Sequence, residues 1–255
     1  VVRDREEIAS WRAHDGDLND GQDPTLDDSS WPSLESWDGA TAPAWYRARF
    51  TVPRRFDGKP VSLSLRVGGY LHSLFNAEAL VYIDGNLAQG LDAFHYDIPL
   101  SESAEGGREY VVALYLFWKP DFDVTDWLPS PGREYPDLDA GTEIQLIDRP
   151  TEEFYWDAAT AFEAAEALGD DSADQVRIIT GVDRAITAVD YRGPLDNVFY
   201  ESAAAAGEAL RAELYSAGPP ENVATALAVG QTHIDLAWFW PIKVNRFKIG
   251  RSVAT

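Results

Sequence analysis

The sequence contains no cysteine and no methionine, and only four of its 21 basic residues are lysine. The lack of cysteine excludes a disulfide framework, a cysteine-ligated zinc site and a thiol nucleophile, and it fits a reducing compartment. The 255 residues contain no apolar run of membrane-spanning length, and the segment that begins at Val1 has no apolar signal core. We therefore expect a globular protein of the cytoplasm.

Positive charge is scarce as well. The chain has 43 acidic residues and a formal net charge of -22, and 17 of its basic residues are arginine. Acidic excess with lysine depleted in favour of arginine resembles proteins of salt-accumulating halophiles, whose carboxylate surfaces stay hydrated in brine. An ordinary acidic surface is the alternative. Either surface repels phosphate groups, so we expect no nucleic-acid partner and no anionic-membrane partner.

Residues 1–150 are predicted to form an antiparallel β-sandwich with a jelly-roll-like topology. Asp84-Gly85 predicts a tight turn that leads into a paired strand. The first 44 residues mix tryptophan with aspartate, serine, glycine and proline, and we expect loops there. Strand character, either as strict alternation or as an unbroken apolar run, is found in residues 45–52, 61–67, 110–118 and 143–147.

The sequence period changes from two to 3.6 beyond the predicted sandwich. Three apolar stripes predict helices within residues 151–220, which we expect to connect two domains. Thr151 is the expected cap of the first helix, and Gly193-Pro194 is the expected start of the third. Residues 226–229 form a short apolar run that is typical of a buried strand, so residues 221–255 are expected to begin an α/β domain. The predicted class is α+β: a sandwich, a helical connector, and the first strand and helix of a truncated catalytic domain.

A polar pair directly after that predicted strand carries the strongest functional signal. His233 and Asp235 are two residues apart, and in an extended segment such residues point to the same side. An imidazole and a carboxylate that converge on one point suit a divalent ion of the zinc type. Further along, Trp238 offers an indole on which a sugar ring can stack. The pair alone is a weak signal, because most His-x-Asp pairs are surface or hydrogen-bonded residues.

The longer string around the pair resembles the opening motif of glycoside hydrolase family 38, the class II α-mannosidases. The resemblance implies that His233 and Asp235 bind a catalytic zinc ion and that Trp238 packs against mannose of an oligosaccharide substrate. It also implies a retaining mechanism whose nucleophile, general acid and last histidine ligand lie beyond Thr255. We therefore expect an N-terminal, truncated part of such an enzyme that is inactive alone. The string reads Gly230-Gln231-Thr232-His233-Ile234-Asp235-Leu236-Ala237-Trp238-Phe239-Trp240-Pro241.

The resemblance extends more diffusely into the predicted sandwich and past the motif. Lys248 and Arg251 fit basic positions of the family. Residues 243–245 depart from it, because members usually carry Arg-Glu-Thr where this chain has Lys-Val-Asn. An acid that would support the metal site is therefore missing at Val244. The upstream matches, in the order of the non-catalytic N-terminal region of vacuolar-type and bacterial members, are Trp45-Tyr46-Arg47, Glu78, residues 80–86, residues 89–92 and His95.

A second function remains open from the residues themselves. The chain can be a stand-alone carbohydrate-binding or interaction sandwich in which the His-x-Asp pair is vestigial. Asp92 and His95 resemble an acid–base pair, but within a sandwich a structural hydrogen bond between them is favoured. Most tryptophan and tyrosine side chains are expected to anchor the core or the loops, and few to form a platform for sugar.

Overall fold

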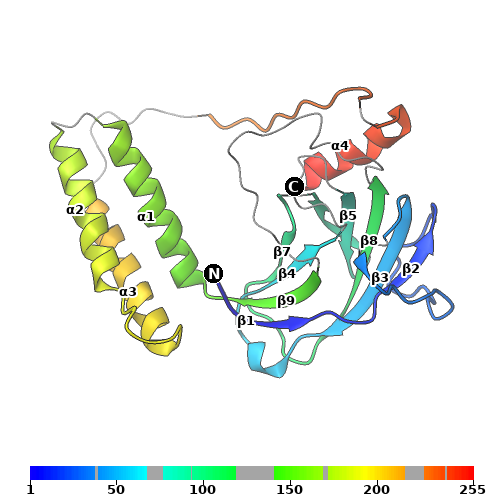
Figure 1. Cartoon of the computed structure of the whole chain (residues 1–255), viewed down its shortest axis with the longest axis horizontal. Helices are drawn as coiled ribbons and strands as arrows, with labels where there is room; N and C mark the ends of the chain where they lie inside the picture. Colours follow the sequence, from blue (N-terminus) through cyan, green and yellow to red (C-terminus); the bar gives the residue numbers. More distant parts are fainter. Residues whose placement is uncertain are drawn as a thin grey trace. The chain divides into compact units, whose positions relative to one another are not determined.

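The computed structural model describes residues 1–37, 40–67, 77–92, 94–118, 141–168, 172–215, 227–238 and 240–255. These residues separate into two compact units. Figure 1 labels helices and strands of both. The predicted α+β class, with an antiparallel β-sandwich and helices, is confirmed. The helical unit comprises Val1–Arg3 and Ile147–Val229, and the sandwich unit comprises Asp4–Leu146 and Gly230–Thr255.

Two β-sheets build the sandwich unit. One has the strand order β1-β9-β4-β7, and the other has the order β2-β3-β8-β5-β6. The neighbours β2–β3, β3–β8, β8–β5, β5–β6, β4–β7 and β4–β9 pair in antiparallel fashion. The bounds are β1 (Val2–Glu7), β2 (Arg12–Asp15), β3 (Ala44–Thr51), the 3₁₀ turn η2 (Arg54–Phe56), β4 (Val61–Arg66), β5 (Glu78–Ile83), β6 (Asn86–Leu91), β7 (Asp97–Ser101), β8 (Glu109–Trp118) and β9 (Gly141–Ile147).

The central strand of the second sheet is β8, which pairs with β3 on one side and with β5 on the other. Both of its faces are buried, as its unbroken apolar sequence predicts. Leu114 and Leu116 belong to the core between the two sheets, whereas Tyr115 and Phe117 belong to an aromatic cluster on the outer face. Burial of one such leucine stabilises the fold by about 2 kcal/mol. The sheet therefore has a second apolar face that another element has to cover.

The tight turn predicted between two strands is present at Asp84-Gly85. Asp84 has φ 49° and Gly85 has φ 82°, which are the positive values of a two-residue hairpin turn with the twist of its strands. The turn joins β5 to β6, and the two strands pair with each other. Glycine is favoured at the second position because it has no Cβ to oppose a positive φ.

Two edge strands, β1 and β2, form where the sequence predicts only loops. Their side chains are mostly exposed or half-buried, so they show no apolar stripe. Each lies at the end of its sheet and is held by backbone pairing to an inner strand, β9 or β3. The aromatic anchor between them is Trp11, whose Nε1 donates to Ile8 O at 3.1 Å and to Thr142 Oγ1 at 2.8 Å. An edge strand needs such partners more than it needs apolar residues.

The helical unit contains α1 (Arg149–Ala167), α2 (Ala173–Ala188) and α3 (Asn197–Leu214). Phe154, Val182 and Leu210, one from each helix, belong to its apolar core. Gly207 of α3 lets α1 approach closely, because a Cβ there would lie 3.1 Å from the Cβ of Phe154. Among the described residues, no helix is long and apolar enough to cross a membrane.

Both predicted helix starts in this unit are wrong by a few residues. The first helix is capped by Asp148 and not by Thr151: the Asp148 carboxylate accepts from the backbone N of Thr151 at 3.2 Å and from its hydroxyl at 2.7 Å. The third is capped by Asp196, which accepts from two backbone N–H groups, and it begins after Gly193-Pro194. Aspartate is favoured at the capping position because its carboxylate accepts hydrogen bonds from the backbone N–H groups that have no partner within the first turn of a helix.

The strand expected at residues 226–229 is not formed in its described part, 227–229, and Ala226 lies outside the described residues. Leu227 and Val229 are 87% and 74% exposed. No described strand pairs with this run, and an unpaired strand is not stable in water. Residues 230–255 also differ from the expected division, because they join the sandwich unit instead of opening a separate one. They form the 3₁₀ turn η3 (Ile242–Val244) and the predicted helix, α4 (Asn245–Ala254).

Candidate functional site

The helix α4 packs on the outer face of the second sheet, where it contacts β5 and β6. Figure 1 shows α4 beside β5. Its buried side is made by Val244, Phe247, Lys248 and Arg251, whose spacing of three and four residues defines one face of a helix. Phe247 lies 5.0 Å from Tyr115 and 5.4 Å from Phe117, measured between ring centroids. Half of this face is apolar and half is charged, so the sheet has to supply carboxylates as well as aromatic rings.

Those carboxylates come from Glu78 and Asp92. Lys248 donates to Glu78, and the two residues are only 4% and 6% exposed. Arg251 lies 3.2 Å from the other oxygen of Glu78 and 3.2 Å from Asp92. Asp92 in turn lies 2.8 Å from His95 Nδ1, so the pair of Asp92 and His95 has the structural role expected for it. These ion pairs join residues 78–95 of the sandwich to residues 248–251 of α4.

Lys248 is also enclosed by two tryptophans. Its Nζ lies 3.8 Å from the ring centroid of Trp240 and 4.9 Å from that of Trp118. Burial lowers the pKa of Lys248 below its usual range, while the charge and hydrogen bond of Glu78 oppose the change. Cation–π contact with two rings further favours the charged ammonium.

Gly90 is the reason that α4 can lie so close to β6. A Cβ at this position would be 2.4 Å from Arg251 Cγ and 2.6 Å from the backbone oxygen of Arg251. Real Cβ atoms do not approach other heavy atoms this closely. The glycine therefore makes room for the backbone of α4, and it lies in the hairpin that also carries Asp92.

His233 and Asp235, the predicted metal ligands, converge as expected. His233 Nε2 and Asp235 Oδ1 are 3.4 Å apart, and their side chains are 80% and 49% exposed. With Zn–N and Zn–O bonds of about 2.1 Å at the tetrahedral angle, two ligand atoms of one zinc ion lie about 3.4 Å apart. The pair thus fits two corners of a zinc site. Within the described ranges, no group of three or more histidine, cysteine, aspartate or glutamate residues is placed to complete it.

Asn245 supports this pair. Its Nδ2 donates to the backbone oxygen of Asp235 at 2.9 Å, and its Oδ1 accepts from Trp240 Nε1 at 2.9 Å. Val244, where an acid was expected, is buried in the aromatic cluster instead. The polar contact with the Asp235 backbone therefore comes from Asn245, the residue that follows Val244.

Trp238, the predicted sugar-stacking residue, is 55% exposed. Its ring meets that of Trp240 edge-on, with centroids 6.2 Å apart and planes inclined by 77°. Trp240 is buried and packs in the same manner on Trp118 of β8. The exposed indole is thus held at the end of a row of tryptophans that begins in the sandwich. Phe239 lies outside the described residues.

The chain is similar in part to known proteins. No family model matches the chain. Mouse alpha-mannosidase 2C1 is 24% identical over 217 residues, which cover 83% of this chain and 19% of that protein. This chain thus spans about a fifth of the length of the curated relative.

Solved structures resemble only part of the chain. A glycosyl hydrolase family 2 member from Bacteroides cellulosilyticus is 16% identical, covers 56% of this chain and 20% of its own, and has a TM-score of 0.35. The β-glucuronidase of Bacteroides uniformis is 16% identical, covers 56% of this chain and 18% of its own, and has a TM-score of 0.37. Likeness of this extent leaves the activity open.

A second buried charge cluster lies under the loop before β3. Asp28 accepts from Arg47 Nε at 2.9 Å and from Arg49 Nη1 at 3.0 Å. Burial of Asp28 opposes its ionisation, but the bonds from the two arginines outweigh burial and hold the pKa of this carboxyl below its usual value. Arg47 also donates to the backbone oxygen of Gly21 at 2.5 Å. This cluster attaches a long loop to the sheet. The hydrogen bonds described for it join residues of the sandwich unit to one another.

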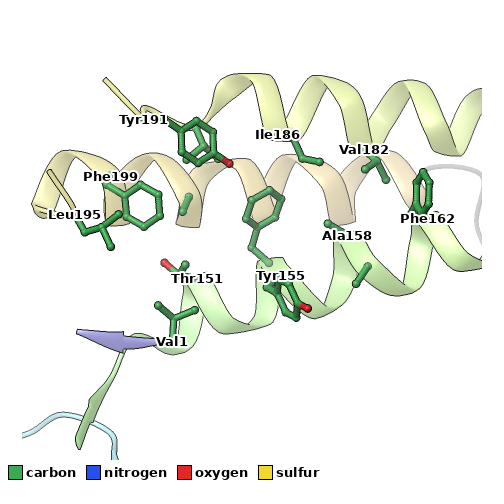
Figure 2. Close-up of a pocket in the computed structure, with 14 residues that line it drawn as sticks. Val1, Thr151, Tyr155, Ala158, Phe162, Val182, Ile186, Tyr191, Leu195 and Phe199 are labelled. Atoms are coloured by element: carbon green, nitrogen blue, oxygen red, sulfur yellow. The ribbon is translucent and has the colours of Figure 1, made fainter. Parts of the chain in front are cut away.

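The helical unit has an apolar cavity of about 500 Å³. Figure 2 shows the side chains that line it, among them Tyr155 and Phe162 of α1 and Ile186 of α2. A sugar needs several hydrogen-bond partners, and the polar side-chain groups of this lining are the hydroxyls of Thr151, Tyr155 and Tyr191. We therefore place the candidate site at the His233–Asp235 segment.

Sequence reasoning predicted His233, Asp235 and Trp238 as site residues, and it did not predict the contacts that Asn245 and Trp240 make beside them. Lys248 and Glu78 were noted only as separate matches to a family. One signal was available, since Lys248 falls on the same helical face as Val244. A lysine on an apolar face has to find a buried carboxylate or leave the core.

Proposed function

We propose that this chain is the N-terminal part of a glycoside hydrolase, namely a zinc-dependent, retaining α-mannosidase that acts on mannose-containing oligosaccharides. The observation that carries the proposal is the convergence of His233 Nε2 and Asp235 Oδ1 to 3.4 Å beside an exposed tryptophan. The likeness to alpha-mannosidase 2C1 supports the same class of reaction.

His233 and Asp235 would hold the zinc ion through one nitrogen and one carboxylate oxygen. When bound, zinc would supply a Lewis acid for the oxygen atoms of the sugar. A stable site needs at least one more protein ligand, and a retaining glycosidase needs two further carboxyl groups about 5 Å apart. We propose that these groups come from another part of the full-length protein, so that the part played by this chain is to bind and to orient.

Trp238 would bind the sugar by contact with its apolar face. An indole ring buries the C–H groups of a pyranose without a hydrogen bond, and it does not coordinate metal. Its edge contact with Trp240 limits the tilt of the ring. Trp238 and the metal pair therefore have separable roles, which allows each to be tested alone.

The decisive experiment uses the full-length protein encoded by the gene. Hydrolysis of an aryl α-mannoside is compared with that of an aryl β-glucuronide, and bound zinc is measured in the same samples. We expect turnover of the mannoside alone, loss of zinc and turnover in Asp235→Ala, and retained zinc with a raised KM in Trp238→Ala. Asp183→Ala, which removes an exposed carboxylate of α2, serves as the matched control.

Two results would reject the proposal in different ways. A full equivalent of zinc and normal turnover in Asp235→Ala would remove the metal assignment. Binding of mannose oligosaccharides without turnover by the full-length protein would favour the carbohydrate-binding sandwich instead. Exclusive cleavage of the β-glucuronide would place the enzyme in another class.

A further inference from the structure

We infer that Asn245, Lys248 and Glu78 are positioning residues, which set the place of Asp235 through a continuous series of contacts that begins in the sandwich. The part of this inference that treats Asp235 as a metal ligand rests on the proposed function. It assigns a direct role in the site to the β-sandwich, whose hairpin supplies Glu78.

The series starts from the buried ion pair of Glu78 and Lys248. Both side chains are withdrawn from water, so displacement of Glu78 would leave the buried ammonium of Lys248 without its carboxylate, and displacement of Lys248 would leave Glu78 with Arg251 alone. The ammonium group lies 3.8 Å from the centroid of the Trp240 ring. A cation held in this way limits the position of the indole against which it lies.

Trp240 passes this constraint to Asn245. The indole Nε1 can only donate a hydrogen bond, and the backbone oxygen of Asp235 can only accept one. The amide of Asn245 meets both at 2.9 Å, with its oxygen toward Trp240 and its nitrogen toward Asp235. Only one orientation of the amide satisfies both partners. The side chain of Asn245 therefore links the indole of Trp240 to the backbone of Asp235 in one fixed orientation.

The exposed pair of His233 and Asp235 needs the link that Asn245 provides. The His233 and Asp235 side chains are 80% and 49% exposed, so little packing holds them. The segment around them has no regular secondary structure among residues 227–238. A functional group has to be held to within about 0.5 Å of its working position. In the described structure, the side-chain bond that holds the Asp235 backbone comes from Asn245.

The test exploits the absence of cysteine, because two introduced thiols can be labelled without interference. Nitroxide labels at Thr51→Cys on β3 and Ala237→Cys beside the motif report the distribution of distances between the sandwich and the segment. Both positions are exposed. The distribution is recorded for the 255-residue chain, for Asn245→Ala, for Lys248→Met, and for Asn19→Ala, an exposed asparagine that serves as the control.

We expect a narrow distribution for the unsubstituted chain and for the control, and one at least twice as broad for Asn245→Ala and Lys248→Met. Hydrogen exchange of β4 and β9 verifies that the sandwich is intact in each variant. If Lys248→Met unfolds, Asn245→Ala decides alone, because its side chain lies at the surface end of the series. An unchanged width in Asn245→Ala overturns the inference.

Zinc affinity supplies a second readout in the full-length protein, by competition with a chelator. Loss of a residue that orients a ligand typically lowers metal affinity by 10- to 100-fold, and we expect at least a tenfold loss in Asn245→Ala. A protein that binds no zinc at all rejects the proposed function, while the label distances still decide the positioning. Broad distances with unchanged zinc affinity overturn the role of Asn245 toward the metal.

Discussion

Glu78 on β5 and Lys248 on α4 are 170 residues apart in the sequence, and they form a buried ion pair. Lys248 of this pair lies against Trp118 and Trp240, which belong to the aromatic cluster between α4 and the sheet. The pair therefore links the sandwich to the segment with the predicted metal ligands. The charge pair and the rings around it form a single layer on the outer face of the sheet.

Removal of the ammonium group should weaken the fold. Lys248→Met leaves Glu78 buried with only Arg251 nearby, and loss of one partner of a buried pair typically costs about 3 kcal/mol or more. Urea denaturation should show this decrease in the free energy of unfolding. The double variant Glu78→Gln with Lys248→Met should recover part of it, because no unpaired charge remains. Lys59→Met, at an exposed lysine, should change little; an equal loss there would contradict the role of burial.

Stability should depend on pH through Asp28. The pKa of Asp28 is lowered in the folded state from a usual value of 3.8. A carboxyl with a lowered pKa contributes stability above its unfolded pKa and loses it as the pH falls through the folded pKa. Urea midpoints between pH 6 and pH 2 should therefore fall more steeply for the unsubstituted chain than for Asp28→Asn. Parallel profiles would contradict the assignment, and Asp183→Asn serves as the exposed control.

Gly90→Ala should loosen α4. The added methyl would meet Arg251 within 2.6 Å, so the helix backbone has to move away from β6. Overpacking of this kind costs about 1–3 kcal/mol. Amide hydrogen exchange should rise in residues 245–254 and stay unchanged in β3 and β8. Gly193→Ala, where a Cβ meets nothing within 4 Å, provides the comparison. Unaltered exchange in α4 would show that the close approach has no consequence.

Salt should stabilise the chain if the acidic surface is an adaptation to brine. At a net charge of -22, repulsion between carboxylates opposes the compact state. The Debye length falls from about 10 Å at 0.1 M to about 3 Å at 1 M salt. The Tm should therefore rise markedly between 0.05 M and 2 M potassium chloride. A Tm that stays flat or falls over this range would remove the halophilic interpretation.

The inner strands and the helices could be predicted because their side chains alternate or form stripes. Residues 110–118 are apolar on both faces, and β8 is accordingly buried on both. The edge strands β1 and β2 escaped prediction for the opposite reason. Residues 2–7 are mostly charged, yet they form β1, because backbone pairing with β9 is sufficient at the end of a sheet.

Local sequence patterns did not predict the exact helix starts or the structure of the run at residues 226–229. Thr151 and Gly193-Pro194 are plausible starts, but Asp148 and Asp196 supply stronger acceptors a few residues away. An apolar run becomes a strand only beside another strand. Residues 227–229 have no such neighbour in the part of the chain that the structure describes.

The sequence by itself determined the α+β class, the Asp84-Gly85 hairpin and the pair of His233 and Asp235, because each depends on residues close together in the chain. Only the tertiary structure decided that Glu78 meets Lys248, that Gly90 admits α4, and that Asn245 holds the backbone of Asp235. These contacts join segments up to 170 residues apart. Local propensity carries no information about which distant carboxylate a buried lysine will meet, since that choice is made by the packing of α4 on the sheet.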